Sequence, residues 1–268
     1  MAERQKSAER RPERVQSLDR TFSLLECLAD GPLTLSELAE ATALPMPTVH
    51  RLLRFLSTQG YVRQERSKRY ALGLRMIRLG QTASRGLGPW ITPYLTRLVE
   101  QYGETANMAI LEGDVCVYVA QVPSPQSMRM FTEVGRAVMP HCTGVGKAIL
   151  SELPDEQAAR LLERTGMPER TEHTLTTVPD MLKVLDRGRA DGFVLDDGEQ
   201  ELGVRCIAVP LRGMPFGAAI SISGPSSRIR STDVRHIAPQ LISVAREVSE
   251  SFAAATSTED GQGAGFAS

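Results

Sequence analysis

The chain has 268 residues, 41% hydrophobic and 24% charged, an ordinary composition for a globular protein, and no stretch approaches the length of a membrane-spanning helix. Four scattered cysteines without a Cys-x-x-Cys pair indicate neither a disulfide framework nor a zinc site. The first 14 residues are charged and polar and lack the apolar core of a signal peptide, so we expect a cytoplasmic protein.

Positive charge is concentrated in the first third of the chain, although the formal net charge is only −1. Residues 1–90 contain 15 Lys or Arg against 9 Asp or Glu, whereas the remainder contains 16 against 23. Between Thr42 and Trp90, nine basic residues accompany a single acid, Glu65. Basic residues favour contact with a phosphate backbone, because each neutralised phosphate releases counterions. The asymmetry predicts a nucleic-acid-binding part joined to a part with another role.

The N-terminal region begins with a polar segment and then shows helical patterns. We expect residues 1–14 to be a disordered arm, because they are rich in charge and poor in apolar side chains. Apolar residues at helical spacing predict a first helix over residues 17–29. Thr34 and Glu37 form a capping-box pattern, which predicts that a second helix begins here and continues through residue 41.

A third helix is predicted from about residue 47 to residue 59, with Pro47 at its first position and Gly60 at its end. Its apolar residues recur at i, i+3, i+4 and i+7 and form one stripe: Val49, Leu52, Leu53 and Leu56. The opposite face carries Thr48, His50, Arg51 and Arg54. Two short strands, 61–64 and 69–72, follow around a charged turn. Three helices and a basic hairpin are typical of a winged helix-turn-helix.

In such a domain the third helix enters the major groove, and the hairpin, or wing, can reach the minor groove. Arg51 and Arg54 suit guanine edges or phosphates, and the other two polar residues of that face, Thr48 and His50, suit phosphates or bases. From the wing we expect three further contacts: Arg66, Lys68 and Arg69. A winged helix can also bind proteins, but the excess of basic over acidic residues favours DNA.

The rest of the chain predicts a linker helix and a second domain. A helical pattern over 74–83 precedes a glycine- and proline-rich break at 86–89, so we assign 15–74 to the DNA-binding domain, 75–90 to the linker helix and 91–254 to the second domain. Predicted helices are 92–102, 155–164, 180–190 and 232–254, and predicted strands are 105–111, 115–121, 127–134, 193–197, 204–211 and 218–223. This mixture predicts an α+β fold with helices on a mostly antiparallel sheet. Residues 255–268 are expected to be a disordered tail.

A glycine-containing stretch, residues 141–147, precedes an apolar helical segment and is a candidate anion site. Amide groups at a helix N-terminus and the helix dipole favour negative charge. The similarity to a phosphate-binding P-loop fails, because His141 stands where the first glycine belongs and Ala148 replaces the Ser or Thr that holds magnesium. A Gly-x-Gly-Lys stretch is also compatible with a simple packing turn.

Further polar residues of the second domain favour ligand binding over catalysis. Ser221 and Ser223 alternate with isoleucines, so their hydroxyls face one side of a strand. Asp196 ends another predicted strand, where a turn with solvated acids is the simpler interpretation. No nucleophile elbow, metal-ligand cluster or zinc-protease motif is present, so we predict no enzyme, no metal and no cofactor. The alternative is an enzyme that uses Cys142 or Cys206 as its nucleophile.

Motifs in both halves of the chain resemble those of the IclR family of bacterial transcriptional regulators, over residues 15–254. In the first half these are Val15-Gln16-Ser17-Leu18-Asp19-Arg20, Thr48-Val49-His50-Arg51-Leu52-Leu53, Gly60-Tyr61-Val62 and Tyr70-x-Leu72-Gly73. In the second half they are Phe131-Thr132-x-Val134-Gly135, His141-x-Thr143-Gly144-x-Gly146-Lys147-Ala148, Asp196-Asp197-x-Glu199, Gly203-Val204-Arg205-Cys206 and Ser221-Ile222-Ser223-Gly224-Pro225.

The resemblance implies a winged helix-turn-helix, a linker helix and a C-terminal effector-binding domain related to GAF folds. It also implies homodimers, often paired into tetramers, on near-palindromic operator DNA. The implied effector pocket comprises Met130, Val138, Gly144, Val145, Asp196, Val204, Cys206, Ser221 and Ser223. In the implied arrangement, the amides of Gly144 and Val145 receive a carboxylate. Asp196, Cys206 and the two serines contact the other oxygens, while the remaining residues form apolar walls.

Residues 103–108, 118–123 and 127–136 more narrowly resemble AllR-type repressors of allantoin catabolism. This likeness implies repression of purine or allantoin catabolic genes and release by a small carboxylate, either allantoate or glyoxylate. The connection over residues 210–217 is shorter than the usual hairpin loop of the family, which affects the depth of the pocket. The alternative is a regulator, activator or repressor, of the catabolism of aromatic acids or other carboxylates. An aromatic effector would need an enlarged apolar pocket, whereas Met130 and the paired serines make this pocket too small and polar for an aromatic ring.

Overall fold

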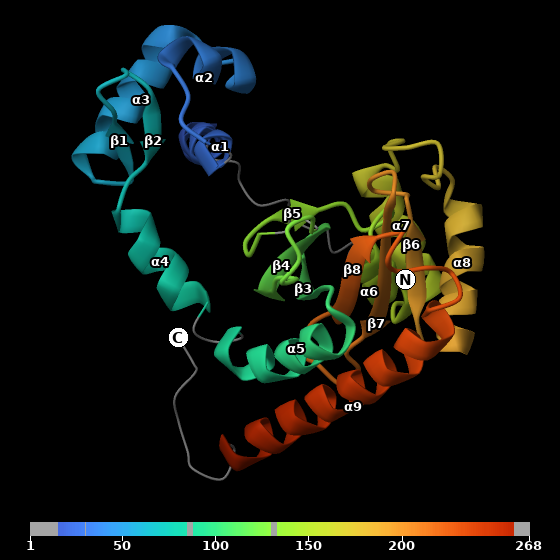
Figure 1. The fold of residues 1–268 in the computed structure, drawn as a ribbon. Coiled ribbons are helices and arrows are strands. Elements are labelled where there is room, and N and C mark those ends of the chain that lie inside the picture. The colour runs from blue at the N-terminus through green and yellow to red at the C-terminus, as the bar shows by residue number, and fades with distance from the viewer. Residues whose placement is uncertain (1–15, 30, 85–87, 130–132, 260–268) are drawn as a thin grey trace, which may run out of the picture. The chain divides into compact units, whose positions relative to one another are not determined.

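The computed structural model describes residues 16–29, 31–84, 88–129 and 133–259, and the chain divides into two compact units between Ala83 and Ser84 (Figure 1). This division falls within the predicted linker helix. The predicted arm, residues 1–14, lies outside the described residues. Of the described helices, none has the length and apolar character that crossing a bilayer requires.

The N-terminal unit is a small helical domain with a two-stranded hairpin. Its elements are α1 (Gln16–Ala29), α2 (Leu35–Thr42), α3 (Met46–Thr58), β1 (Val62–Gln64), β2 (Tyr70–Leu72) and α4 (Arg75–Ser84). β1 and β2 pair antiparallel, with Val62 opposite Leu72. The first three helices and the hairpin share one core: Leu24, Leu28, Leu38, Val49, Leu53, Leu56, Val62 and Tyr70. These elements confirm the predicted winged helix-turn-helix.

Local sequence signals explain the path of the chain between α2 and α3. The Thr34 hydroxyl accepts a hydrogen bond from the Glu37 amide at 3.2 Å, and the Glu37 carboxylate accepts one from the Thr34 amide at 2.7 Å. This predicted capping box satisfies two donors at the start of α2. α2 ends at Ala43, whose left-handed φ of 52° turns the chain toward α3. Of the predicted α3 stripe, Leu52 is only half-buried.

The C-terminal unit contains a six-stranded antiparallel sheet with helices on both faces. Its strands are β3 (Thr105–Glu112), β4 (Val115–Val122), β5 (Ala137–Val138), β6 (Val194–Asp197), β7 (Val204–Pro210) and β8 (Ala218–Pro225), in the spatial order β5-β4-β3-β8-β7-β6. Its helices are α5 (Gly88–Tyr102), α6 (Gly144–Ser151), α7 (Asp155–Thr165), α8 (Val178–Asp191) and α9 (Val234–Glu259). The predicted α+β class with a mostly antiparallel sheet is confirmed.

The two faces of the sheet bury different clusters, because side chains alternate along each strand. α5 and α9, which run side by side in Figure 1, cover the face that carries Met108, Ile207 and Ile220. α6 covers the other face and contacts Ala208 and Ala219. α7 and α8 pack outside α6. The small side chains beneath α6 let this helix lie close to the sheet, and Ser221 and Ser223 share its side of β8.

The predicted strand over residues 127–134 is wrong for the residues that the structure describes. Ser127 and Met128 form a bend, and the chain turns tightly between Glu133 and Arg136, whose amide donates to the Glu133 carbonyl at 3.1 Å. Gly135 has a φ of +92°, which reverses the chain before pairing begins. The strand of this region is therefore β5, which pairs antiparallel with Cys116 and Val117.

Two predicted boundaries also differ from the structure. α9 continues to Glu259, past the predicted start of the tail at residue 255, because the first strong helix breaker beyond Ala254 is Gly261. Residues 260–268 lie outside the described residues. α5 begins at Gly88 rather than at 92, because Pro89 is accommodated in the first helical turn. Trp90 belongs to the second unit, where its indole packs edge-on against Phe252 at 5.7 Å and donates to the Ser251 hydroxyl at 3.2 Å.

Candidate functional sites

The exposed face of α3 carries the predicted DNA contacts. His50, Arg51 and Arg54 are exposed, and Thr48 is half-buried. They lie opposite the stripe that packs into the domain core, so the basic side chains project away from that core. The first turn of α3 adds little to this, because Pro47 has no N–H and the Thr48 and Val49 amides donate to the Pro45 carbonyl at 2.8 and 3.1 Å. This face can therefore hold both phosphates and base edges.

The predicted wing residues lie in two different environments. Arg66 and Lys68 are exposed at the hairpin turn, where Lys68 adopts a left-handed φ of 64°. Arg69 instead donates to the Pro32 carbonyl at 2.7 Å and to the Glu37 carboxylate at 3.1 Å. These contacts fasten the wing to the start of α2. Arg69 thus has a structural partner in the free domain, and its contact with DNA stays a prediction.

A small cavity of about 60 Å³ lies between the start of α6, the sheet and the loop that joins β6 to β7. Its lining residues are Tyr118, Arg136, Val138, Thr143, Gly144, Asp196, Gln200, Glu201, Val204, Cys206 and Ser223. The lining includes six of the nine predicted pocket residues. Val145 and Ser221 are buried nearby without lining the cavity, and Met130 lies outside the described residues.

The start of α6 is built on close backbone approaches. The Thr143 hydroxyl caps the helix by accepting from the Gly146 amide at 3.3 Å. A Cβ on Gly146 would lie 2.4 Å from the Pro140 carbonyl oxygen, and one on Gly144 would lie 2.7 Å from the Cys206 sulfur. Both positions therefore require glycine for packing. The helix N-terminus is pressed against β7, with the Gly144 amide facing the Cys206 sulfur.

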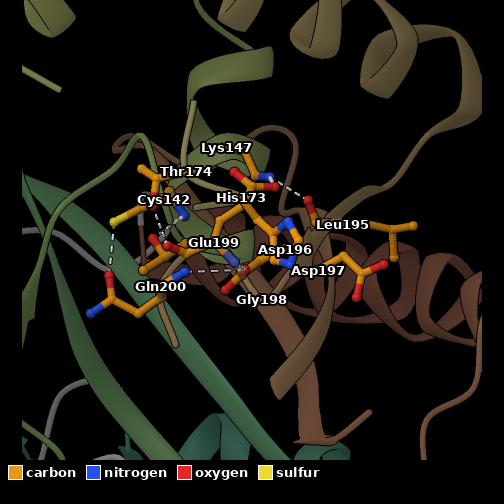
Figure 2. Close-up of polar contacts among 12 residues, drawn as sticks. Cys142, Lys147, His173, Thr174, Leu195, Asp196, Asp197, Gly198, Glu199 and Gln200 are labelled. Carbon is orange, nitrogen blue, oxygen red and sulfur yellow. Dashed lines mark hydrogen bonds and ion pairs between the residues drawn. The ribbon is translucent and has the colours of Figure 1, made fainter. Parts of the chain in front are cut away.

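Lys147 is fully buried and does not line the cavity, and its side chain points toward Leu195 and Glu199 (Figure 2). Its ammonium group donates to the Leu195 carbonyl and forms an ion pair with Glu199. Glu199 belongs to the β6–β7 loop, residues 198–203, which the Thr171 and Thr174 hydroxyls also hold through the Gly198 and Glu199 carbonyls at 2.6 Å each. α6 and this loop are thereby locked together.

Asp196 is buried, unlike the solvated turn acid of the simpler interpretation. One of its oxygens, Oδ1, accepts hydrogen bonds from the amides of Glu199 at 2.8 Å and Gln200 at 3.4 Å (Figure 2). Burial raises the pKa of Asp196 to about 6, and the Lys147 ammonium opposes that rise. The neighbouring Asp197 points outward and pairs with Arg205 at 2.7 Å. The cavity therefore contains a carboxylate whose ionised form is destabilised by burial.

Replacing Asp196 with asparagine is expected to stabilise the protein at pH 7.5 by about 1–3 kcal/mol. The amide oxygen can still accept from Glu199 and Gln200, and no charge is buried. Because the folded-state pKa of Asp196 is raised, its protonation stabilises the fold below about pH 4, and this contribution is lost as the pH rises through about 6. Urea denaturation at pH 7.5 and pH 4 measures both values. The gain in the free energy of unfolding should be smaller at pH 4. Asp197→Asn, the control, should give no gain. An Asp196→Asn protein that is less stable than the wild type at pH 7.5 would contradict the unfavourable buried charge assigned to Asp196.

The two serines of β8 take part in a buried polar cluster. The Asn107 side chain donates to the Ser223 hydroxyl at 3.2 Å and accepts from Gln121 at 3.2 Å. The Ser221 hydroxyl is buried and faces the Cys206 sulfur, a weak acceptor, and within the described part of the chain it has no nitrogen or oxygen partner. An unsatisfied buried hydroxyl is unfavourable, so a ligand that supplies a partner gains affinity there. Asn107 and Gln121 were not predicted, although both face the same side of adjacent strands as Ser223.

The cysteines are ill-suited to nucleophilic catalysis. Burial raises the pKa of Cys142 and of Cys206 to about 12, with the nearby Asp196 carboxylate adding to the rise, so neither is a thiolate at neutral pH. The Cys142 thiol donates to the Gln200 side chain at 2.7 Å. His141 lies within 3.1 Å of the Pro168 carbonyl. The adjacent His141 and Cys142 therefore serve separate contacts.

Five lining residues were absent from the predicted site: Tyr118, Arg136, Thr143, Gln200 and Glu201. Thr143 could have been predicted from the sequence, because it directly precedes the helix that begins at Gly144. Arg136 ends the AllR-like segment 127–136, and Gln200 and Glu201 follow the Asp196-Asp197 pair. Their approach to the cavity depends on the sheet order and on the loop that Lys147 holds.

Two family models match the chain: "IclR helix-turn-helix domain" over residues 17–66 and "Bacterial transcriptional regulator IclR C-terminal" over residues 82–250. The acetate operon repressor of Salmonella typhimurium is 38% identical over 248 residues, which cover 89% of this chain and 90% of the relative. The repressor AllR of Escherichia coli K12 is 32% identical over 222 residues, covering 80% and 82%. An IclR transcriptional regulator from Alicyclobacillus acidocaldarius matches with a TM-score of 0.76 and 25% identity, covering 89% of this chain and 99% of that structure.

Proposed function

Because the chain belongs to the IclR family of bacterial transcriptional regulators, we propose that it is a repressor that a small carboxylate releases from operator DNA. Family and relatives are regulators and not enzymes. The protein acts in the cytoplasm without a cofactor, as a homodimer or a dimer of dimers on a near-palindromic operator. α3 and the wing bind the operator, and the cavity beside α6 binds the effector.

The observation that carries this proposal is the position of the cavity at the N-terminal end of α6. Amides and the helix dipole make this end attractive to an anion, and the unsatisfied Ser221 hydroxyl lies nearby. A cavity of about 60 Å³ is far below the ~300–1,000 Å³ typical of sites for drug-sized ligands, so it suits a ligand of a few heavy atoms. This size favours glyoxylate over allantoate and over the aromatic acids of the alternative hypothesis, since both of these are considerably larger than glyoxylate.

The regulated pathway is proposed from likeness to relatives. The motifs shared with AllR-type repressors favour genes of purine or allantoin catabolism and allantoate or glyoxylate as effector. A second candidate, repression of an acetate operon, is favoured by the higher identity to the acetate operon repressor, 38% against 32% for AllR. Both candidates use a small carboxylate, and the upstream DNA that the protein binds distinguishes them.

The effector acts only through its different affinity for the DNA-bound and DNA-free forms. Such coupling is typically about 1–3 kcal/mol, so release should appear as a ~5–150-fold loss of operator affinity at saturating effector. Calorimetry against glyoxylate, allantoate and protocatechuate, followed by a gel shift on the gene's own upstream DNA, tests this. Release by glyoxylate or allantoate supports the proposal. Binding of the aromatic acid alone, or tighter DNA binding with effector, contradicts it.

The double substitution Ser221→Ala with Ser223→Ala is expected to leave operator affinity unchanged and to abolish release. Loss of two hydroxyls at about 0.5–1.5 kcal/mol each should weaken effector binding by ~5–150-fold. A gel shift with increasing glyoxylate or allantoate measures release, and Ser227→Ala, at an exposed position, is the matched control. Release by the double variant at the wild-type effector concentration would show that the site lies elsewhere.

A further inference from the structure

A series of three hydrogen-bonded side chains crosses the sheet and ends at the cavity. Gln121 on β4 donates to Asn107 Oδ1 at 3.2 Å, and Asn107 Nδ2 on β3 donates to the Ser223 hydroxyl on β8 at 3.2 Å. Gln121 lies directly opposite Asn107 in the strand pairing, whereas Ser223 lies diagonal to it, two residues beyond the direct partner Ser221. Of the three side chains, Ser223 lines the cavity and the other two do not.

The direction of these hydrogen bonds determines what Ser223 offers to a ligand. A serine hydroxyl has one proton, and the oxygen of Ser223 already accepts from Asn107. Its proton therefore points away from Asn107, and within the described part of the chain the hydroxyl donates to no acceptor. Because Ser223 is 5% exposed and lines the cavity, a ligand in the cavity is the partner that this proton can reach.

The same side chains could form the series in the opposite direction. If both amides were reversed, Asn107 Oδ1 would face Ser223 and would receive the hydroxyl proton. Ser223 would then present only lone pairs to the cavity, beside the acceptor oxygens of Asp196 and Glu201. The oxygens of a carboxylate or carbonyl are also acceptors, so they would meet no donor there. The observed direction supplies the donor that such an oxygen needs.

We infer that Asn107 is a positioning residue that, with Gln121, orients the Ser223 hydroxyl to donate to an acceptor oxygen of the effector. This inference rests on the proposed function and adds to the anion site at the start of α6. Neither amide contacts the effector itself. Ser221, whose hydroxyl faces the Cys206 sulfur, does not depend on Asn107 in this way. The effector oxygen bound at Ser223 is therefore a carboxylate or carbonyl oxygen.

A double-mutant cycle separates positioning from a general structural role. Calorimetry at pH 7.5 with glyoxylate, and with allantoate in parallel, should show that Asn107→Ala weakens binding by ~3–10-fold, the net effect of one hydrogen bond. In a protein that already carries Ser223→Ala, the same substitution should change the affinity by less than ~2-fold, because its target is absent. In a protein that carries Ser221→Ala, the full loss should remain. A general structural defect would weaken binding equally in all three backgrounds.

Gln121→Glu reverses the series with little change in side-chain shape. The carboxylate cannot donate, so Asn107 Nδ2 should turn toward it and Asn107 Oδ1 should turn toward Ser223. The Ser223 proton is then directed to Asn107, and binding of glyoxylate or allantoate should weaken by ~10–100-fold. Gln126→Glu adds the same charge at an exposed position outside the lining and should leave the affinity unchanged. Thermal unfolding first shows that each variant is folded at the temperature of calorimetry.

The outcomes distinguish this inference from the proposed function. If Ser223→Ala weakens binding but Asn107→Ala and Gln121→Glu do not, the inference is overturned and the proposed function stands. The inference is also overturned if Asn107→Ala causes the same loss with and without the Ser223 hydroxyl. If the wild-type protein binds neither glyoxylate nor allantoate, both fail. Loss through Asn107 that requires Ser223, together with weak binding by Gln121→Glu, supports the inference.

Discussion

Truncation of Lys147 to alanine is expected to lower the free energy of unfolding of the C-terminal unit by about 3–5 kcal/mol. The Lys147 side chain is 1% exposed, and its partner Glu199 is 12% exposed. Without the ammonium group, Glu199 keeps a buried charge with no counter-ion, and the Leu195 carbonyl loses its donor. The loop over 198–203 also loses its tie to α6, so effector affinity should fall as well. Urea denaturation and calorimetry measure the two losses.

A surface ion pair provides the control for this prediction. Lys183 pairs with Asp180 at 2.9 Å, but these side chains are 72% and 54% exposed, so Lys183→Ala should cost less than ~1 kcal/mol. The double substitution Lys147→Met with Glu199→Gln should recover much of the loss, because it leaves no unpaired buried charge. Equal stability of Lys147→Ala and Lys183→Ala proteins would show that the buried pair does not stabilise this domain.

Arg51→Ala is expected to weaken operator binding by ~5–150-fold, the effect of losing about 1–3 kcal/mol from a contact to a base edge. Arg51 is exposed on α3 beside Arg54 and away from the domain core. If Arg51 contacts a phosphate instead, the loss of affinity should be similar for specific and random DNA. The slope of the logarithm of the binding constant against the logarithm of the salt concentration should then decrease in magnitude by about one. Gel shifts on both DNAs at two salt concentrations distinguish these contacts.

The effector site should not respond to this substitution. Calorimetry should give the same affinity for glyoxylate or allantoate in Arg51→Ala and in the wild type, because the cavity lies in a separately folded unit. Arg160→Ala removes the same charge from an exposed position of the C-terminal unit and should leave operator binding unchanged. An Arg51→Ala protein that shifts operator DNA at wild-type concentrations would remove α3 from the proposed interface.

Local patterns predicted most elements, since their causes lie within a few residues. The capping box at Thr34 and the apolar stripe that includes Val49 and Leu53 specify α2 and α3 without distant contacts. Apolar runs likewise identified β7 and β8. The prediction of a strand over 127–134 was wrong, because the chain turns at Gly135 and pairs with β4 only after that turn. The alternation of apolar residues before Gly135 does not indicate this later start.

The site was less predictable because its charges come from distant segments. The sequence indicated the helix N-terminus at Gly144 and the serines of β8, both of which follow local rules. It gave no means of pairing Lys147 with Glu199, 52 residues later, or of bringing Arg136 to the same cavity as Asp196. These contacts depend on how α6 packs across the sheet, because β5 and β6 themselves occupy opposite edges.

The position of Trp90 has a spectroscopic consequence. It is the only tryptophan of the chain, and it lies at the start of α5 against Tyr94 and Phe252, within the C-terminal unit. Indole emission therefore reports on the packing of α5 against α9. A denaturation curve followed by tryptophan fluorescence and one followed by far-ultraviolet circular dichroism should diverge wherever the two units melt separately. One optical probe thus isolates the stability of the effector domain in the intact chain.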